Sequence, residues 1–156
     1  MLVKLSGDWE RVSNVLNSLS TNLGENVQNA LEETANEALN TIQGHIDSQD
    51  LGWSSLSDST VKIKGHDTIY IESGELRDSF QVTQLSSGDT TSFQVGIPSG
   101  SRHSSSGLPT SQLMEYMEYG TIKQPARPLI RPSVQEVKPK FLRVVSGAIK
   151  DVMRGK

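Results

Sequence analysis

Two arginines set among three prolines are the side chains in this sequence best suited to specific recognition. Residues 125–132 have the sequence Pro-Ala-Arg-Pro-Leu-Ile-Arg-Pro, so Arg127 and Arg131 each precede a proline. Proline fixes φ near −65°, cannot donate a backbone hydrogen bond, and drives the preceding residue toward extended geometry. A planar guanidinium on such a stiff segment can bond two acceptors at once. This pattern favours contact with another protein, and a rigid linker before a last helix is the alternative.

Residue types that often carry catalysis are present but lack the neighbours that catalysis requires. His45, His66 and His103 have no second ligand at metal-binding spacing. Ser73 precedes Gly74, but the strained strand–turn–helix context of a nucleophile is missing, and helix capping explains this serine better. The sequence has no cysteine and no glycine-rich phosphate loop. We therefore expect neither an enzyme nor a bound metal or cofactor.

The longest element that the sequence predicts is an amphipathic helix over residues 9–47. Its apolar residues recur at spacings of three and four, which places them in a narrow stripe on one face. The stripe comprises Val12, Val15, Leu16, Leu19, Leu23, Val27, Ala30, Leu31, Ala35, Ala38, Leu39, Ile42 and Ile46. Gly24 is a weak point, because glycine costs about 1 kcal/mol relative to alanine within a helix. A helix on the order of 50 Å long cannot bury its stripe inside one small domain, so we expect part of the stripe to meet another chain.

The middle of the chain, residues 48–120, predicts a body that contains a small antiparallel sheet. Apolar and polar residues alternate on both sides of a turn-rich connection, which is typical of a hairpin near residues 80–97. The serine- and glycine-rich segment 98–110 has nothing to bury and is expected to be a mobile loop. The residues expected to anchor this body are Trp53, Leu76, Phe80 and Gly120. Trp53 is expected to pin its loop onto the sheet, with an interface role as the alternative.

The remaining segments complete a single domain, 1–156, in which a proline-braced arm at 121–132 leads into a helix over 133–156. Pro132 suits the first position of that helix, whereas Pro139 lies inside it and is expected to kink it or delay its start. These elements together predict an α+β fold with a long N-terminal helix, a small antiparallel sheet and a C-terminal helix. No apolar run approaches membrane-spanning length, and we expect no membrane partner.

Charge is segregated along the chain, whose formal net charge is −3. Residues 121–156 contain nine Lys and Arg and two acids, which gives a net charge of +7. Residues 1–120 contain six Lys and Arg and 16 acids, which gives a net charge of −10. Head-to-tail self-association would explain this, as would nucleic-acid contact through the basic segment or a solvated basic helix face. Phe141 is the one aromatic residue in that segment, which disfavours a dedicated single-strand binder, because such proteins stack bases on aromatic side chains.

Four segments, taken in order, resemble the minor tail-component and tail-completion proteins of long-tailed bacteriophages, and the Mu-type virion morphogenesis proteins look similar. The segments are 52–65 with Trp53, Leu56 and Thr60; 71–80 with Ser73, Gly74, Leu76 and Ser79; 116–121 with Glu118 and Gly120; and 125–132 with Arg127. They match a W-x-x-L-x-x-x-T segment, a hydrophobic-x-x-S/T-G-x-L-x-x-S turn, a hydrophobic-E-x-G turn and a P-x-R-P arm. Pro139 and the long loop at 98–110 depart from the family pattern.

The resemblance implies a structural protein of the virion neck that forms a homo-oligomeric ring, a hexamer or a dodecamer, and is assembled in the host cytoplasm. The implied partners are the head connector or adaptor and the tail terminator or tube, with DNA passing through the lumen without sequence-specific binding. On this hypothesis the arm reaches a neighbouring copy. The contact residues would be Arg127, Pro128, Leu129, Ile130 and Arg131, with Leu129 and Ile130 seated in an apolar surface of that copy.

Overall fold

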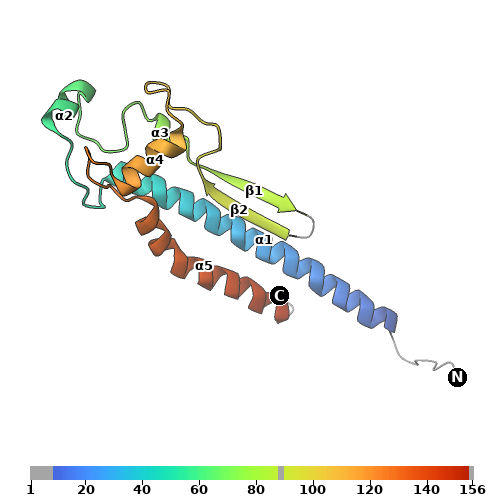
Figure 1. Cartoon of the computed structure of the whole chain (residues 1–156). Helices are drawn as coiled ribbons and strands as arrows, with labels where there is room; N and C mark the ends of the chain where they lie inside the picture. Colours follow the sequence, from blue (N-terminus) through green and yellow to red (C-terminus); the bar gives the residue numbers. More distant parts are fainter. Residues whose placement is uncertain (1–8, 88–89, 155–156) are drawn as a thin grey trace.

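The computed structural model describes residues 9–87 and 90–154, and Figure 1 shows the elements along the chain. They are α1 (Trp9–Ser48), α2 (Asp58–Lys64), α3 (Glu75–Asp78), β1 (Gln81–Ser87), β2 (Thr90–Gly96), α4 (Thr110–Tyr119) and α5 (Ile130–Met153). The expected α+β fold, with its long first helix, antiparallel hairpin and last helix, is confirmed.

α1 and α5 run antiparallel and pack against each other along most of α5 (Figure 1). Two contacts between charged or titratable side chains show which residues of α1 lie beside which residues of α5. The Lys140 ammonium bonds the Glu37 carboxylate, and Nε2 of His45 lies 3.3 Å from Oε2 of Glu136. Apolar packing accompanies these contacts, because Ile42 on α1 and Val137 on α5 are both buried.

α1 is one unbroken helix of 40 residues, so Gly24 does not split it. At 1.5 Å per residue, the two contacts above place Met153, the last residue of α5, level with about residue 26 of α1. Residues 9–25 therefore project beyond α5 by on the order of 25 Å. Figure 1 shows this first part of α1 passing beyond the hairpin as well. We call residues 9–25 the α1 extension.

The hairpin packs on α1 mainly through β2. β1 and β2 pair antiparallel, with Val82 opposite Val95 and Gln84 opposite Phe93. Because successive side chains of a strand point to opposite faces, Val82, Phe93 and Val95 share one face of the hairpin. That face lies toward α1, whereas Leu85 is on the other face and is exposed.

A single core cluster joins α1, the loop before α3, α4 and the start of α5. Its buried members are Ile42, Ile46, Ile69, Tyr70, Leu76, Phe80, Met114 and Leu129. Leu76 and Phe80 lie in this core, as the sequence predicts. Trp53 is half-buried and packs against the cluster, so its aromatic ring serves as an anchor of the body.

Two predictions about the second half of the chain are wrong. α5 begins at Ile130, before the expected residue 133, and continues through Pro139, so this proline does not delay its start. A kink at Pro139 stays a prediction. The loop 98–110 does bury a side chain, since His103 is 5% exposed. The backbone N–H of Ser104 donates to the Glu75 carboxylate at 3.0 Å, which ties the loop to α3. The expectation that the loop buries nothing is therefore wrong, and its mobility stays a prediction. The partner that holds this loop, Glu75, lies 29 residues earlier in the chain than Ser104.

Candidate functional site

The proline-rich segment 125–132 folds back against the body of its own chain. Arg127 is 5% exposed and Leu129 is fully buried. Nε of Arg127 donates to the carbonyl of Ser54 at 2.9 Å, and Nη2 donates to the carbonyl of Ser55 at 3.1 Å. The hypothesis that Arg127 and Leu129 reach a neighbouring copy is therefore wrong, because their own chain already encloses both side chains.

Backbone groups of this segment are bonded by side chains and backbone of the body. The Arg127 N–H donates to the Met117 carbonyl at 2.7 Å, and the Arg127 carbonyl accepts from the Tyr70 hydroxyl at 2.5 Å. The Pro128 carbonyl accepts from Nε1 of Trp53 at 2.7 Å. The two aromatic rings pack together, with centroids 5.0 Å apart. Burial raises the pKa of the Tyr70 hydroxyl, which keeps it a donor at neutral pH.

The buried carboxylate of Glu118 caps the N-terminus of α5. Glu118, the next-to-last residue of α4, is 8% exposed. Its Oε2 accepts from the N–H groups of Leu129 at 2.6 Å and Ile130 at 2.9 Å, and its Oε1 accepts from the N–H of Arg131 at 3.1 Å. The first N–H groups of a helix lack intrahelical acceptors and carry partial positive charge, so a carboxylate is favourable there. The sequence indicates Glu118 only through the family pattern; local spacing gives no sign of this role.

Gly120 turns the chain from α4 into the proline-rich segment. Its backbone has φ 77° and ψ 177°, a conformation essentially confined to glycine. A Cβ at this position would lie 2.7 Å from the Ala126 nitrogen and 3.0 Å from the Gln124 oxygen. The side chains and the glycine that hold this segment are Trp53, Tyr70, Glu118, Gly120 and Arg127, which we call the clasp.

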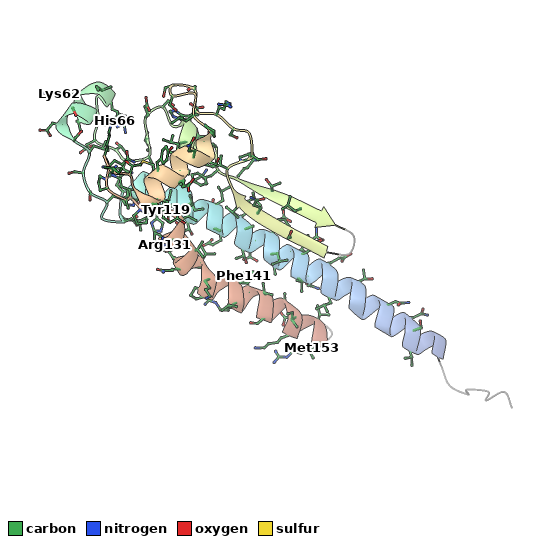
Figure 2. All side chains as sticks on the ribbon, in the orientation of Figure 1. Lys62, His66, Tyr119, Arg131, Phe141 and Met153 are labelled. Atoms are coloured by element: carbon green, nitrogen blue, oxygen red, sulfur yellow. The ribbon has the colours of Figure 1, made fainter. Side chains whose placement is uncertain are left out.

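The other three predicted contact residues differ from Arg127 and Leu129 in their exposure. Pro128 and Ile130 are half-buried, and Ile130 packs against the core. Arg131 is exposed, with its guanidinium carbon 5.8 Å from the ring centroid of Tyr119, and Figure 2 shows the two side chains near the junction of α4 and α5. An interface role for Arg131 stays a prediction.

An open apolar groove lies between β2 and α5, with α1 as its floor. Its volume is about 500 Å³. Thr34, Ala35 and Ala38 form the floor, and Phe93 on β2 and Phe141 on α5 contribute to the walls. Small floor residues allow an incoming apolar side chain to approach α1 closely. The groove therefore suits an apolar element and offers little to bind a charged ligand.

A row of exposed apolar side chains continues from this groove along α5. Val134 is 55% exposed, Leu142 57%, Ile149 40% and Met153 80%. Their spacings of eight, seven and four residues place them on one side of the helix. Figure 2 shows Phe141 partway along α5 and Met153 at its far end. We call these four residues the α5 flank.

The α1 extension also presents exposed apolar side chains. Val12 is 46% exposed and Leu23 is 38% exposed. They precede the buried Ala30 and Thr34 by whole helical turns, since the successive spacings are 11, seven and four residues. The face of α1 that is covered near Thr34 therefore continues along the extension, where Leu23 and Val12 lie exposed on it.

One cluster near α3 contains a serine, a histidine and a glutamate, the residue types of a catalytic site, but their geometry does not fit catalysis. Oγ of Ser105 lies 3.1 Å from Nδ1 of His103, but Oγ of Ser106 competes at 3.3 Å. Nε2 of His103 lies 4.0 Å from Oε2 of Glu75, beyond hydrogen-bond distance. Hydrogen bonds from Ser104 hold the pKa of Glu75 below its ordinary value and occupy the carboxylate. The cluster fastens the loop to α3 and forms no proton relay.

Comparisons of the chain with protein-family models, with curated proteins and with solved structures found no match. Within residues 9–87 and 90–154, no helix has the length and apolar content needed to cross a membrane. In the same residues, no three His, Cys, Asp or Glu side chains are grouped so that they could hold a metal ion.

Proposed function

We propose that the protein is a structural subunit of the neck of a tailed bacteriophage, where copies form a closed ring that completes the tail and joins it to the head connector. The family resemblance is one support, because the α+β fold that it implies is the fold of this chain. The resembling segments also meet in space: Trp53 bonds Pro128, Arg127 bonds Ser54, and Glu118 bonds Leu129. Segments that jointly specify one fold are expected to converge in this way.

The observation that carries the proposal is the uncovered apolar face of the α1 extension. An isolated helical segment of this length is marginal in water and gains most of its stability from packing. Val12 and Leu23 are 46% and 38% exposed, although the same face is buried farther along α1. A second copy can supply the missing cover. Contacts between two different surfaces of identical subunits close into rings when the rotation allows it.

Charge supports contacts between copies that bring α1 and α5 together. α1 carries six acids and one arginine, whereas α5 carries five Lys and Arg and two acids. Lys140 and Glu37 already pair across these helices within one subunit. Opposite net charge would speed and orient the association of one subunit with the next, and salt would weaken it.

Native mass spectrometry and negative-stain electron microscopy of the purified chain test the proposal. We expect a closed ring of six or twelve copies with a central lumen, and a lower ring yield at high salt. The measurement is then repeated with the connector and tail-tube proteins of the phage that encodes the chain. A chain that stays monomeric at every concentration and salt, both alone and with these partners, contradicts the proposal.

A nucleic-acid-binding module acting through the basic C-terminal segment is the alternative function. The exposed side of α5 is as apolar as it is basic, because Leu142 and Ile149 lie among its cations, and this favours a protein partner. A filter-binding titration tests the alternative. Contacts to several phosphates require an affinity that falls by orders of magnitude between low and physiological salt. No binding at low salt excludes it.

A further inference from the structure

α1 offers a binding face for α5 that is longer than α5 itself. Within one subunit this face is covered near Thr34 and Ala30, which are 7% and 5% exposed. It continues along the α1 extension to Leu23 and Val12, beyond the level at which α5 ends. The uncovered part is therefore a continuation of an interface that the fold already uses.

α5 has a second apolar side that its own subunit does not use. Val137 and Val152 are buried against the body. Leu142, Ile149 and Met153 lie about 60–100° farther round the helix and face outward, and Val134 lies at the edge between the two sides. The flank adjoins the groove at Val134, which lines the groove and is also exposed. The two surfaces therefore share Val134 and present apolar side chains next to one another.

We infer that the α1 extension of one copy packs against the α5 flank and the adjoining groove of the next copy. The inference rests on the proposed ring and names the contact that would build it. Each subunit would give one helix end and receive another, so the contact is heterologous and repeats around a ring. Packing one apolar helix stripe against another is the same ridge-and-groove contact that joins α1 and α5 within the subunit.

The extension cannot reach the middle of the α5 flank within its own subunit. Leu142 lies level with about residue 37 of α1, so about 14 residues, or roughly 20 Å, separate it from Leu23 along the helix axis. Val12 lies still farther away. A straight helix cannot fold back over that distance, so a contact between Leu23 and Leu142 can form only between two molecules.

Disulfide trapping tests the contact directly, because the chain contains no cysteine. A bridge requires Cα atoms within about 7 Å, so Leu23→Cys with Leu142→Cys can close only between molecules. Val12→Cys with Leu142→Cys tests the same contact with the α1 extension shifted by 11 residues along α5. Under mild oxidation we expect a ladder of covalent oligomers that ends at the ring number found by native mass spectrometry.

Ile63→Cys with Leu142→Cys is the matched control. Ile63 is 87% exposed, more than Leu23 or Val12, but it lies on α2, away from the proposed contact. This pair should remain mostly monomeric on a non-reducing gel. Equal crosslinking of the control and test pairs would mean random collision and would overturn the inference.

The outcomes separate this contact from the ring itself. Rings in the microscope with neither test pair crosslinked would overturn the contact and leave the ring, and the extension would then be covered by another neck protein. Open chains crosslinked through the test pairs would support the contact and contradict closure. Monomers without any crosslink would overturn both.

Discussion

The clasp and the free helical faces use their side chains in opposite ways. The clasp contains an arginine, a carboxylate and two aromatic donors, and each of these has a partner within the same chain. The α1 extension and the α5 flank offer aliphatic side chains that the described part of the chain leaves exposed. The arginine, the carboxylate and the aromatic donors hold the fold, and the aliphatic residues remain exposed for the contacts that we propose.

A physical reason underlies this division. A buried guanidinium or carboxylate without partners costs several kcal/mol, so a subunit that folds before it assembles has to satisfy Arg127 and Glu118 by itself. Exposed aliphatic residues such as Leu23 cost a lone subunit far less and still release free energy when a neighbour covers them. The proposed assembly through aliphatic faces would therefore leave the folding of the subunit undisturbed.

The largest loss of stability is expected from Glu118→Ala in the clasp. The change leaves three N–H groups at the start of α5 without their acceptor and should lower the free energy of unfolding by about 3–5 kcal/mol. Urea denaturation followed by circular dichroism measures this. Glu118→Gln keeps one acceptor oxygen and should lose clearly less. A loss below about 1 kcal/mol for the alanine variant would show that water replaces the carboxylate.

Gly120→Ala is expected to follow, with a loss of about 2–4 kcal/mol from the positive φ and the clash with Ala126. Gly65→Ala is the matched control, because Gly65 also has a positive φ, 79°, but no atom lies within 4 Å of its added Cβ. Its loss should be about 1–2 kcal/mol. Equal losses in the two variants would rule out the clash as the cause.

A smaller effect is expected from the ion pair that joins the end of α1 to α3. The Arg77 guanidinium, hydrogen-bonded to Asp47 at 2.6 Å, holds the pKa of that carboxyl below its ordinary value. Its stabilisation is therefore complete above that ordinary value, near pH 4, and is lost as the pH falls through the lower pKa of the folded state. Thermal melting between pH 5 and pH 2 should fall less steeply for Asp47→Asn. Parallel curves would contradict a role for this pair.

The smallest change in stability is expected from Leu23→Asp, which should alter the free energy of unfolding by no more than about 0.5 kcal/mol. The ring yield in native mass spectrometry should nevertheless fall by at least tenfold, because a carboxylate would enter the apolar contact. Ile63→Asp should change neither quantity. If Leu23→Asp lowered stability as much as a clasp substitution, the proposed division between folding and binding residues would be wrong.

Local patterns in the sequence predict the elements well but not their long-range contacts. Periodicity of three and four specifies α1, and alternation specifies the hairpin, because both signals lie within each element. The proline-rich segment is predicted to be stiff, but stiffness alone does not say where the segment goes. Its direction depends on Ser54 and Met117, which no local pattern connects to Arg127.

The same limit explains the other corrections. Composition predicts a loop at 98–110 that buries nothing, but the Glu75 carboxylate, 29 residues before Ser104, gives the loop a fixed partner. The early start of α5 likewise depends on Glu118, which lies 11 residues before Leu129. An arginine is rarely buried, so a prediction from residue type alone places Arg127 on the surface.

The bonds from Glu118 to the first turn of α5 and the packing of α5 on α1 make the two helices one stiff unit. α5 has 24 residues and is thus about 36 Å long, held by hydrogen bonds from α4 at one end and buried against the body at Val152 near the other. A rotation of this unit by about 10° about its Glu118 end would move its far end by roughly 6 Å. In the proposed ring, such a rotation of each subunit would shift the α5 flank by more than the width of a methyl group and change the diameter of the opening.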